Sequence, residues 1–333
     1  MKVMMSSLRP AGVLGLGTYV PERVLTNADL EKLVDTSDGW ILARTGVRER
    51  RIAGRDESAA TLGARAAQVA ITDAGLRADD VQCIITATIT PNHIFPATAC
   101  LIQEAIGAPS AAAFDVLVGC TGFVYGMVVG AQMVATGAFD TVLVIGTEVF
   151  SRFINWRDRR TCVLFGDGAG AVIIGAVDAG RGLLSFDLGS DGSGSQLLHI
   201  EAGGSTRPAS LLSVLDHAHS LFMNGAEVFR FAVRAMSDST QRALERGKLT
   251  VNDVDLLVPH QANVRIINAA AERLNIPLER VVVNVDKYGN TSAASIPLAL
   301  ADARADGRLK RGSLVVCTSF GGGLSWASCV LRW

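Results

Sequence analysis

Two kinds of hydrophobic pattern alternate along the chain. Short β-branched and apolar runs predict strands over residues 82–87, 141–145, 171–174, 256–258, 281–285 and 314–318. Between them, apolar residues recur every three to four positions, most clearly over residues 58–74 and 227–246, and predict helices. The alternation indicates an α/β protein with mainly parallel or mixed sheets.

The two halves of the chain repeat part of this pattern. A helix, a glycine turn and an acidic residue precede a strand at Asp80, and the same series leads to Asp253, 173 residues later. The strand that begins at Thr141 is matched by the one at Ser313, 172 residues later. Two matches at nearly one offset predict a duplicated fold, with halves 1–178 and 179–333.

The same offset carries Cys120 to position 292, next to Asn290. In both places a strand-like run ends and a helix-like stretch of small residues begins. If the halves pack about a pseudo-twofold axis, Cys120 and Asn290 occupy equivalent helix starts that face each other. The repeat therefore predicts a site where the halves meet, with Cys120 from the first half and Asn290 from the second.

Composition narrows the class of protein. The 333 residues are 49% hydrophobic and 19% charged, which suits a large folded core. A net charge of −1 excludes the overall positive charge typical of a nucleic-acid-binding protein, although a local basic patch is still compatible with it. Six scattered cysteines without a C-x-x-C motif predict neither a disulfide framework nor a metal site, and they indicate a reducing, cytosolic setting.

Two uncharged runs, 116–139 and 312–331, are long enough to span a bilayer. Their glycines and hydroxyl side chains favour buried elements of an α/β core instead, so we expect no membrane span. Residues 1–10 lack an apolar stretch before Pro10, and we expect no signal peptide there.

Cys120 is the first candidate for chemistry. Residues 114–123 are typical of a strand, a tight turn and a helix, and the turn would expose the thiol to backbone N–H groups and a helix dipole that favour thiolate. A buried structural cysteine is the alternative. Gly119 and Gly122 favour the reactive role, because they permit a sharp turn and close approach of a substrate. The other five cysteines lie in apolar runs and keep the structural interpretation.

His260 and Asn290 are the next candidates. His260 follows the strand 256–258, at the sheet edge where α/β folds place ligands. A satisfied structural histidine remains the alternative there, as a helix N-cap does for Asn290.

Two other motifs point elsewhere and fail on context. Residues 166–171 fit G-x-G-x-x-A, but a strand-like run follows instead of the helix that a dinucleotide site needs, and the glycines at 15 and 17 fail similarly. The order Cys, His, Asn also occurs in papain-like peptidases, yet the nucleophile here lies far from the N-terminus.

Nearly the whole chain resembles β-ketoacyl-acyl-carrier-protein synthase III, the initiating condensing enzyme of bacterial type II fatty acid synthesis. The blocks that carry the resemblance are 26–30, 35–40, 44–50, the Cys120 turn, 165–170, 259–263, 289–295 and 321–323. The resemblance implies a thiolase-like fold: two duplicated βαβα halves in a five-layer α-β-α-β-α arrangement. It also implies a cytoplasmic homodimer without a permanently bound cofactor.

The resemblance implies a two-stage reaction. Cys120 attacks a short acyl-CoA, CoA leaves, and malonyl-acyl-carrier protein enters and is decarboxylated. His260 and Asn290 would donate hydrogen bonds to the enolate, and the backbone N–H groups of Cys120 and Gly322 would hold the oxyanion of the condensation.

Binding residues follow from the same resemblance. The expected CoA contacts are Trp40 and Arg159 on the adenine, with Thr36, Arg44 and Asn263 on the rest. Phe95 would wall the acyl pocket of the partner in a homodimer, and Arg230 and Arg265 would dock the acidic carrier protein.

Three features depart from the family pattern: Thr121 after the nucleophile, Val118-Gly119 before it, and Glu272 where some relatives carry a basic residue. They leave the shape of the acyl pocket and the strength of carrier docking open. A related enzyme that primes a polyketide or makes a specialised β-keto product remains an alternative. A non-catalytic acyl-CoA binder is a further one, which the intact Cys120, His260 and Asn290 disfavour.

Overall fold

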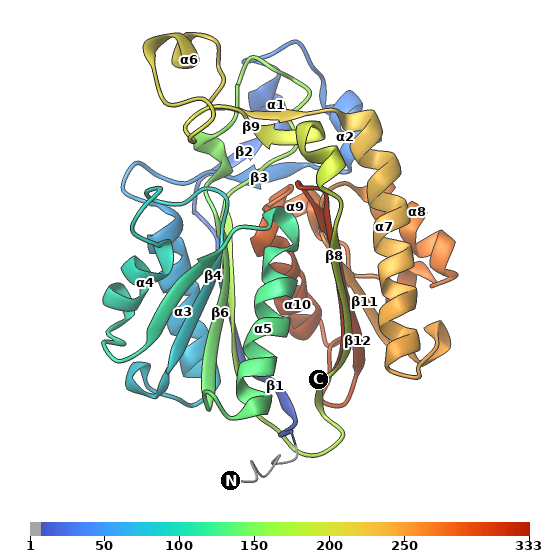
Figure 1. Ribbon diagram of the computed structural model, residues 1–333. Coiled ribbons are helices and arrows are strands. Elements are labelled where there is room, and N and C mark those ends of the chain that lie inside the picture. Colours follow the sequence, from blue (N-terminus) through green and yellow to red (C-terminus); the bar gives the residue numbers. More distant parts are fainter. Residues whose placement is uncertain (1–7) are drawn as a thin grey trace.

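The computed structural model describes residues 8–333 and has five layers (Figure 1). The buried helices α5 (Gly122–Thr136) and α10 (Ser295–Ala305) lie between two sheets. One sheet is covered on its outer face by α3 (Ala59–Asp73) and α4 (Thr98–Ile106). The other is covered by α7 (Gly225–Arg246) and α8 (Val264–Leu274).

The first sheet has five strands in the order β1-β7-β6-β4-β5. Their bounds are β1 Ala11–Tyr19, β4 Cys83–Ala87, β5 Ala112–Val116, β6 Thr141–Glu148 and β7 Gly168–Ala176. Strand β4 runs parallel to both β5 and β6, while β7 is antiparallel to β6 and β1. The carboxyl ends of β4, β5 and β6 therefore meet at one edge of this sheet.

The second sheet repeats this pattern in the order β11-β12-β13-β8. Its strands are β8 Gly182–Ser190, β11 Leu256–Pro259, β12 Leu314–Gly321 and β13 Ser325–Arg332. Strand β11 is parallel to β12, and β13 is antiparallel to β12 and β8, as β7 is to β6 and β1. We propose that the boundary between the halves lies at residue 178, in the connection from β7 to β8.

The predicted helices agree closely with the structure. Helix α3 begins after Ser58, whose hydroxyl accepts a hydrogen bond from the backbone N–H of Thr61 and so caps the first turn. Helix α7 ends at Arg246, as its periodicity predicts. Five of the six predicted strands are confirmed as β4, β6, β7, β11 and β12.

The predicted strand over residues 281–285 is wrong. Only Val281 pairs with the sheet, through a single bridge to Leu257, and a short helix, α9 (Val285–Tyr288), already begins at Val285. The Gln261 side chain explains the turn, because its Oε1 accepts hydrogen bonds from the backbone N–H groups of Asn284 and Val285. The Gln261 side chain therefore binds the backbone N–H groups that would otherwise pair with a neighbouring strand.

The two uncharged runs are core elements. Residues 116–139 hold the turn at Cys120 and α5. Within them the segment Gly119–Thr136 is long and apolar enough to cross a membrane, but it packs between the two sheets. Residues 312–331 form the β12–β13 hairpin. The glycine-rich segment at 166–171 runs into β7, and residues 15 and 17 lie within β1. The expectation about a signal peptide rests on residues that mostly lie outside the described range.

Two small hairpin sheets lie across one end of the layers (Figure 1). One pairs β2 (Val24–Thr26) with β3 (Glu49–Arg51), and the other pairs β9 (Leu198–Ile200) with β10 (Leu221–Met223). The helices α1 (Asn27–Leu30), α2 (Asp38–Thr45) and α6 (Leu211–Leu215) lie at the same end. This end carries the cavity described next.

Candidate active site

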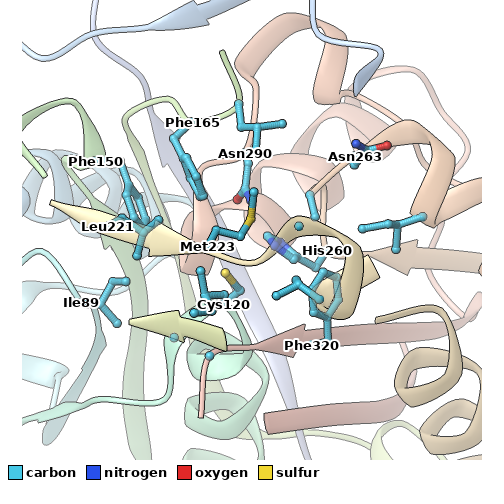
Figure 2. A pocket seen from close by; sticks show the side chains of 18 of the residues that line it. Ile89, Cys120, Phe150, Phe165, Leu221, Met223, His260, Asn263, Asn290 and Phe320 are labelled. Carbon is cyan, nitrogen blue, oxygen red and sulfur yellow. The ribbon is translucent and has the colours of Figure 1, made fainter. Parts of the chain in front are cut away.

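A cavity of about 610 Å³ opens between the two halves beneath the small sheets. Its walls are mostly apolar, and Figure 2 shows side chains from many segments directed into it. Sequence reasoning did not name its aromatic and aliphatic walls, which are Ile89, Phe150, Phe165, Leu221, Met223 and Phe320. Most of them come from loops and short strands that no periodicity marks.

Cys120 lies on a tight turn at the floor of this cavity. The turn is a 3₁₀ helix, Gly119–Thr121, between β5 and α5, and Gly119 has a φ of +58° that favours glycine. The strand, turn and helix predicted around Cys120 are therefore confirmed.

The features expected to favour thiolate are present at Cys120, whose turn lies directly before α5, but burial outweighs them. The side chain is only 7% exposed, and burial raises the pKa of the Cys120 thiol to about 12. The nearby charge of Glu148 raises this pKa further, while a hydrogen bond with Ser292 and the backbone N–H of Cys120 lower it. The cysteine is therefore a neutral thiol at pH 7, and ionisation must be coupled to another event.

His260 follows β11 and is completely buried. Its Nδ1 lies 2.6 Å from Ser295 Oγ, and its Nε2 has no hydrogen-bond partner among the described residues. Burial lowers the pKa of His260 to about 3, so the ring is neutral at pH 7. If Ser295 donates to Nδ1, Nε2 carries the ring proton and can donate it to a bound oxygen.

Asn290 enters the cavity from the second half. Its Oδ1 accepts a hydrogen bond from Ser292 N at 2.8 Å, as an N-cap would, which leaves the side-chain NH₂ available. Asn290 is not a helix N-cap, because Thr291 precedes the turn 292–294 and Ala294 precedes α10. Its Oδ1 instead fixes the backbone of Ser292, and the residue lines the cavity. In Figure 2 the side chains of Cys120, His260 and Asn290 converge on one space.

The glycine triplet 321–323 lies against the Cys120 turn. A Cβ on Gly119 would lie 3.3 Å from Gly322 N, and a Cβ on Gly321 would lie 2.9 Å from Cys120 N. Ser319 Oγ also donates a hydrogen bond to Cys120 O at 2.8 Å. The hairpin thus holds the backbone of Gly322 beside that of Cys120, the two predicted oxyanion donors.

Three of the predicted CoA-binding residues, Trp40, Arg44 and Asn263, line the cavity. The guanidinium of Arg44 lies 4.4 Å from the centroid of the Trp40 ring, and that of Arg159 lies 5.2 Å from it. Asn263 caps α8 and donates from Nδ2 to Arg44 O at 2.8 Å.

Arg159 and Thr36 are near this mouth but do not line the cavity. Arg159 donates a hydrogen bond to the backbone oxygen of Asp35 at 2.8 Å, and it closes over Trp40. The hydroxyl of Thr36 is buried and lacks a hydrogen-bond partner among the described residues.

The remaining predicted residues lie outside the cavity. Phe95 is 87% exposed in the loop after β4. Arg230 and Arg265 are exposed on α7 and α8, where Arg230 pairs with Glu227 and the Arg265 guanidinium lies 5.7 Å from the Phe229 ring centroid. Within residues 8–333 no cluster of His, Cys, Asp or Glu is suited to a metal ion.

Two further polar residues near the nucleophile escaped sequence reasoning. Glu148 ends β6 and accepts a hydrogen bond from Ser292 Oγ at 3.0 Å. The offset that relates Cys120 to position 292 was a usable signal for Ser292. For Glu148 the sequence offered no signal except that the residue follows a buried apolar run.

Comparisons with known proteins agree over nearly the whole chain. Residues 114–192 match the family described as 3-oxoacyl-[acyl-carrier-protein] synthase III, and residues 244–333 match its C-terminal part. β-Ketoacyl-[acyl-carrier-protein] synthase III of Symbiobacterium thermophilum is 54% identical, and the alignment covers 98% of this chain and 99% of that protein.

Solved structures extend the agreement to the fold. The 3-oxoacyl-[acyl-carrier-protein] synthase III of Aquifex aeolicus superposes with a TM-score of 0.91 at 44% identity, covering 97% of this chain and 100% of that one. A priming β-ketosynthase of the R1128 polyketide pathway gives 0.91 at 35% identity, covering 99% and 98%. The predicted thiolase-like fold is confirmed. The chain belongs to the 3-oxoacyl-[acyl-carrier-protein] synthase III family, the acyltransferases that carry out the initiating condensation of fatty acid synthesis.

Proposed function

We propose that this chain condenses a short acyl-CoA with malonyl-acyl-carrier protein, with Cys120 as the nucleophile. The thiol sulfur attacks the thioester carbonyl, and CoA leaves as its thiol. The observation that carries the proposal is the convergence of Cys120, His260 and Asn290 on one apolar cavity. Apolar walls suit an acyl group and exclude the water that would hydrolyse the acyl-enzyme.

In the second stage we propose that His260 and Asn290 stabilise the malonyl enolate. Loss of CO₂ leaves an electron pair on the α-carbon and charge on the thioester oxygen, which the free His260 Nε2–H and Asn290 NH₂ can bind. A neutral histidine is required for this, and the pKa of about 3 keeps it neutral. A preorganised donor of this kind contributes about 3 kcal/mol to the transition state.

The enolate carbon then attacks the acyl group on Cys120. The backbone N–H groups of Cys120 and Gly322 would bind the developing oxyanion, since the hairpin holds both at the floor of the cavity. The attack forms the new C–C bond and gives a tetrahedral adduct. Collapse of this adduct re-forms the carbonyl and breaks the bond to the sulfur of Cys120, which regains a proton.

For CoA we propose entry past Trp40, with the adenine between that ring and Arg159. Arg159 now lies 5.2 Å from the ring centroid, so it must leave Asp35 and move outward to admit the base. Arg44, Asn263 and Thr36 would contact the rest of the molecule. No resident cofactor is needed for these steps.

The acidic carrier protein would dock on the exposed arginines of α7 and α8. Arg230 and Arg265 form the centre of this surface, and Arg234 adds a third exposed cation. Glu272, also on α8, weakens the surface at its far end. We further propose a cytoplasmic homodimer in which Phe95 of each chain closes the acyl pocket of the other.

A polyketide-priming enzyme is the second candidate, because the priming β-ketosynthase of the R1128 pathway shares the fold at 35% identity. The 54% identity to the Symbiobacterium synthase III favours the fatty acid role.

The decisive experiment measures condensation of a panel of acyl-CoAs, from acetyl to medium-chain and branched, with malonyl-acyl-carrier protein and with malonyl-CoA. We expect turnover with carrier-bound malonyl and a short or branched acyl-CoA, together with an acyl adduct on Cys120 by mass spectrometry. A Cys120→Ser variant is the control that should give no adduct. Absence of turnover with carrier-bound malonyl would contradict the proposal, and an unmodified Cys120 would favour a binder.

A further inference from the structure

Glu148 is a buried carboxylate directly behind the nucleophile. It is fully buried and accepts hydrogen bonds from Thr90 Oγ1 at 2.6 Å, Ser292 Oγ at 3.0 Å and Ile89 N at 3.2 Å. Thr88 Oγ1 adds a fourth at 3.3 Å. None of these donors is a cation. Only neutral groups therefore stabilise a charged carboxylate here, and they must offset the free-energy cost of removing it from water.

The equivalent position in the other half of the fold is not a carboxylate. Strands β6 and β12 are equivalent in the two sheets, and their last residues are Glu148 and Gly321. Each of these ends lies against the turn of the other half: Gly321 against Cys120, and Glu148 against Ser292. The glycine lets its strand end pack closely against the Cys120 turn, whereas its counterpart in the first half is a carboxylate.

Ser292 connects the carboxylate to the nucleophile. It occupies the turn of the second half, 292–294, where Cys120 occupies that of the first. Its backbone has a φ of +48°, a conformation that costs a serine free energy, and its N–H is held by Asn290 Oδ1. Its hydroxyl proton is donated to Glu148 Oε1 at 3.0 Å, so its oxygen is left to accept a hydrogen bond from the Cys120 thiol. The turns 119–121 and 292–294 pack against each other, and Ser292 forms a hydrogen bond with the Cys120 side chain.

We propose that Glu148 is a positioning residue that receives, through the Ser292 hydroxyl, the proton which Cys120 loses when it attacks the acyl-CoA. The inference rests on the proposed role of Cys120 as the nucleophile. The S–H bond of Cys120 breaks as its proton passes to Ser292 Oγ, and the Ser292 hydroxyl proton passes to Glu148 Oε1. The sulfur electron pair forms the new C–S bond, and the bond from the acyl carbon to the CoA sulfur breaks.

The same path then returns the proton. It passes from Glu148 through Ser292 to the departing CoA sulfur, so that CoA leaves as a thiol and Glu148 is a carboxylate again. Negative charge is moved within a buried site and is never added to it. This satisfies the requirement that ionisation of the buried thiol be coupled to another event.

The surroundings of Glu148 suit an acceptor. The segments 88–90 and 292–294 and the paired Gly168 of β7 present no titratable side chain to it, and Cys120 is the titratable group that faces it from its turn. Burial raises the pKa of Glu148 to about 7, so the carboxylate is populated at neutral pH and dominates above it. Below pH 7 a protonated Glu148 can no longer take the proton of the thiol.

A simple repulsive role predicts the opposite result. The charge of Glu148 by itself raises the pKa of Cys120. Glu148→Gln would then make Cys120 more reactive if the carboxylate only repelled a thiolate, and less reactive if it accepts the proton. The sign of the effect separates the two roles.

The test measures alkylation of Cys120 in the full-length protein by iodoacetamide between pH 6 and 9, quantified by mass spectrometry. We expect Glu148→Gln and Ser292→Ala each to slow alkylation at pH 8 at least about tenfold and to remove the inflection near pH 7. The double variant should be no slower than either single one, because both interrupt one path. Asp167→Asn is the matched control, since Asp167 is a buried carboxylate held by Ser151 and Ala53 and should leave the profile unchanged.

Equal or faster alkylation in Glu148→Gln would overturn the proposal, as would an unchanged profile in Ser292→Ala. Because alkylation needs no acyl-CoA, this result is independent of the proposed function, which single-turnover acyl transfer from acetyl-CoA tests on the same samples. Ser292→Ala keeps the buried carboxylate and serves alone if Glu148→Gln does not fold.

Discussion

Burial shifts two titratable groups at the floor of the cavity in opposite directions. The pKa of Glu148 rises from 4.5 to about 7, and its contribution to stability, fully present below pH 4.5, is lost as the pH rises toward 7. The pKa of His260 falls from 6.5 to about 3, and its contribution, present above pH 6.5, is lost as the pH falls toward 3. Between pH 4.5 and 6.5 the two slopes cancel.

Glu148→Gln should therefore expose the slope of His260. We expect the free energy of unfolding of the variant, relative to the wild type, to fall by roughly 1.4 kcal/mol for each pH unit between 6.5 and 4.5. Urea unfolding at fixed protein concentration at three pH values measures this difference. Parallel pH profiles for the two proteins would contradict the raised pKa.

His260→Ala and Asn290→Ala should separate the two stages of the reaction. Each removes one enolate donor, so CO₂ release from malonyl-acyl-carrier protein should fall about a hundredfold or more. Acylation of Cys120 by acetyl-CoA, followed by mass spectrometry, should persist. Loss of the acyl adduct with intact CO₂ release would show that the roles are assigned the wrong way round.

Sequence reasoning reached Cys120, His260 and Asn290 because each lies at a turn that local pattern reveals. The partners that set their chemistry are less visible. Ser295 lies 35 residues beyond His260, and Glu148 lies 144 residues before Ser292, so their roles depend on contacts that only the folded chain creates.

At the scale of elements, the contact between a strand end and a turn is the feature that positions the nucleophile. Periodicity identified most of the strands and helices that build it, because buried parallel strands are continuously apolar. It failed over residues 281–285, where a β-branched composition favours a strand but the Gln261 side chain occupies the backbone groups. Residue composition gives the local preference for a strand, but here a tertiary contact determines the backbone conformation.

Gly321→Ala should disturb the nucleophile without touching its side chain. The new Cβ would lie 2.9 Å from Cys120 N, so the turn or the hairpin must shift. We expect the rate of Cys120 acylation to fall about tenfold to a hundredfold, since small misplacements of reacting groups have effects of this size. Gly204→Ala, where an added Cβ meets nothing within 4 Å, is the control expected to keep its rate.

At the scale of the whole molecule, exposed apolar side chains gather on the loops that follow β4 and β5. Ile94, Phe95 and Leu117 are 88%, 87% and 76% exposed. Single exposed apolar residues are common on protein surfaces, but a group of them marks an interaction site. The two strands are adjacent and parallel, so their loops leave the sheet at the same edge. This patch is the surface on which we expect a second chain to pack in the proposed homodimer.

Replacing Ile94 and Phe95 together by Asp should convert the dimer into a monomer, which sedimentation velocity measures. Activity should fall with it, because Phe95 is proposed to complete the acyl pocket of the other chain. Asp at Leu211 and Leu212, an exposed apolar pair on α6, is the matched control that should leave the dimer intact. A wild-type monomer, or a variant that stays dimeric, would contradict the assignment.

The cavity between the halves has one more consequence. A ligand that fills it contacts Cys120 from one half and His260, Asn290 and Phe320 from the other, so its binding energy is shared by both. Such a ligand links the two halves, because unfolding of either half would remove part of its binding site and release it. A tightly bound acyl-CoA analogue should therefore raise the melting temperature of both halves together, in a single unfolding transition.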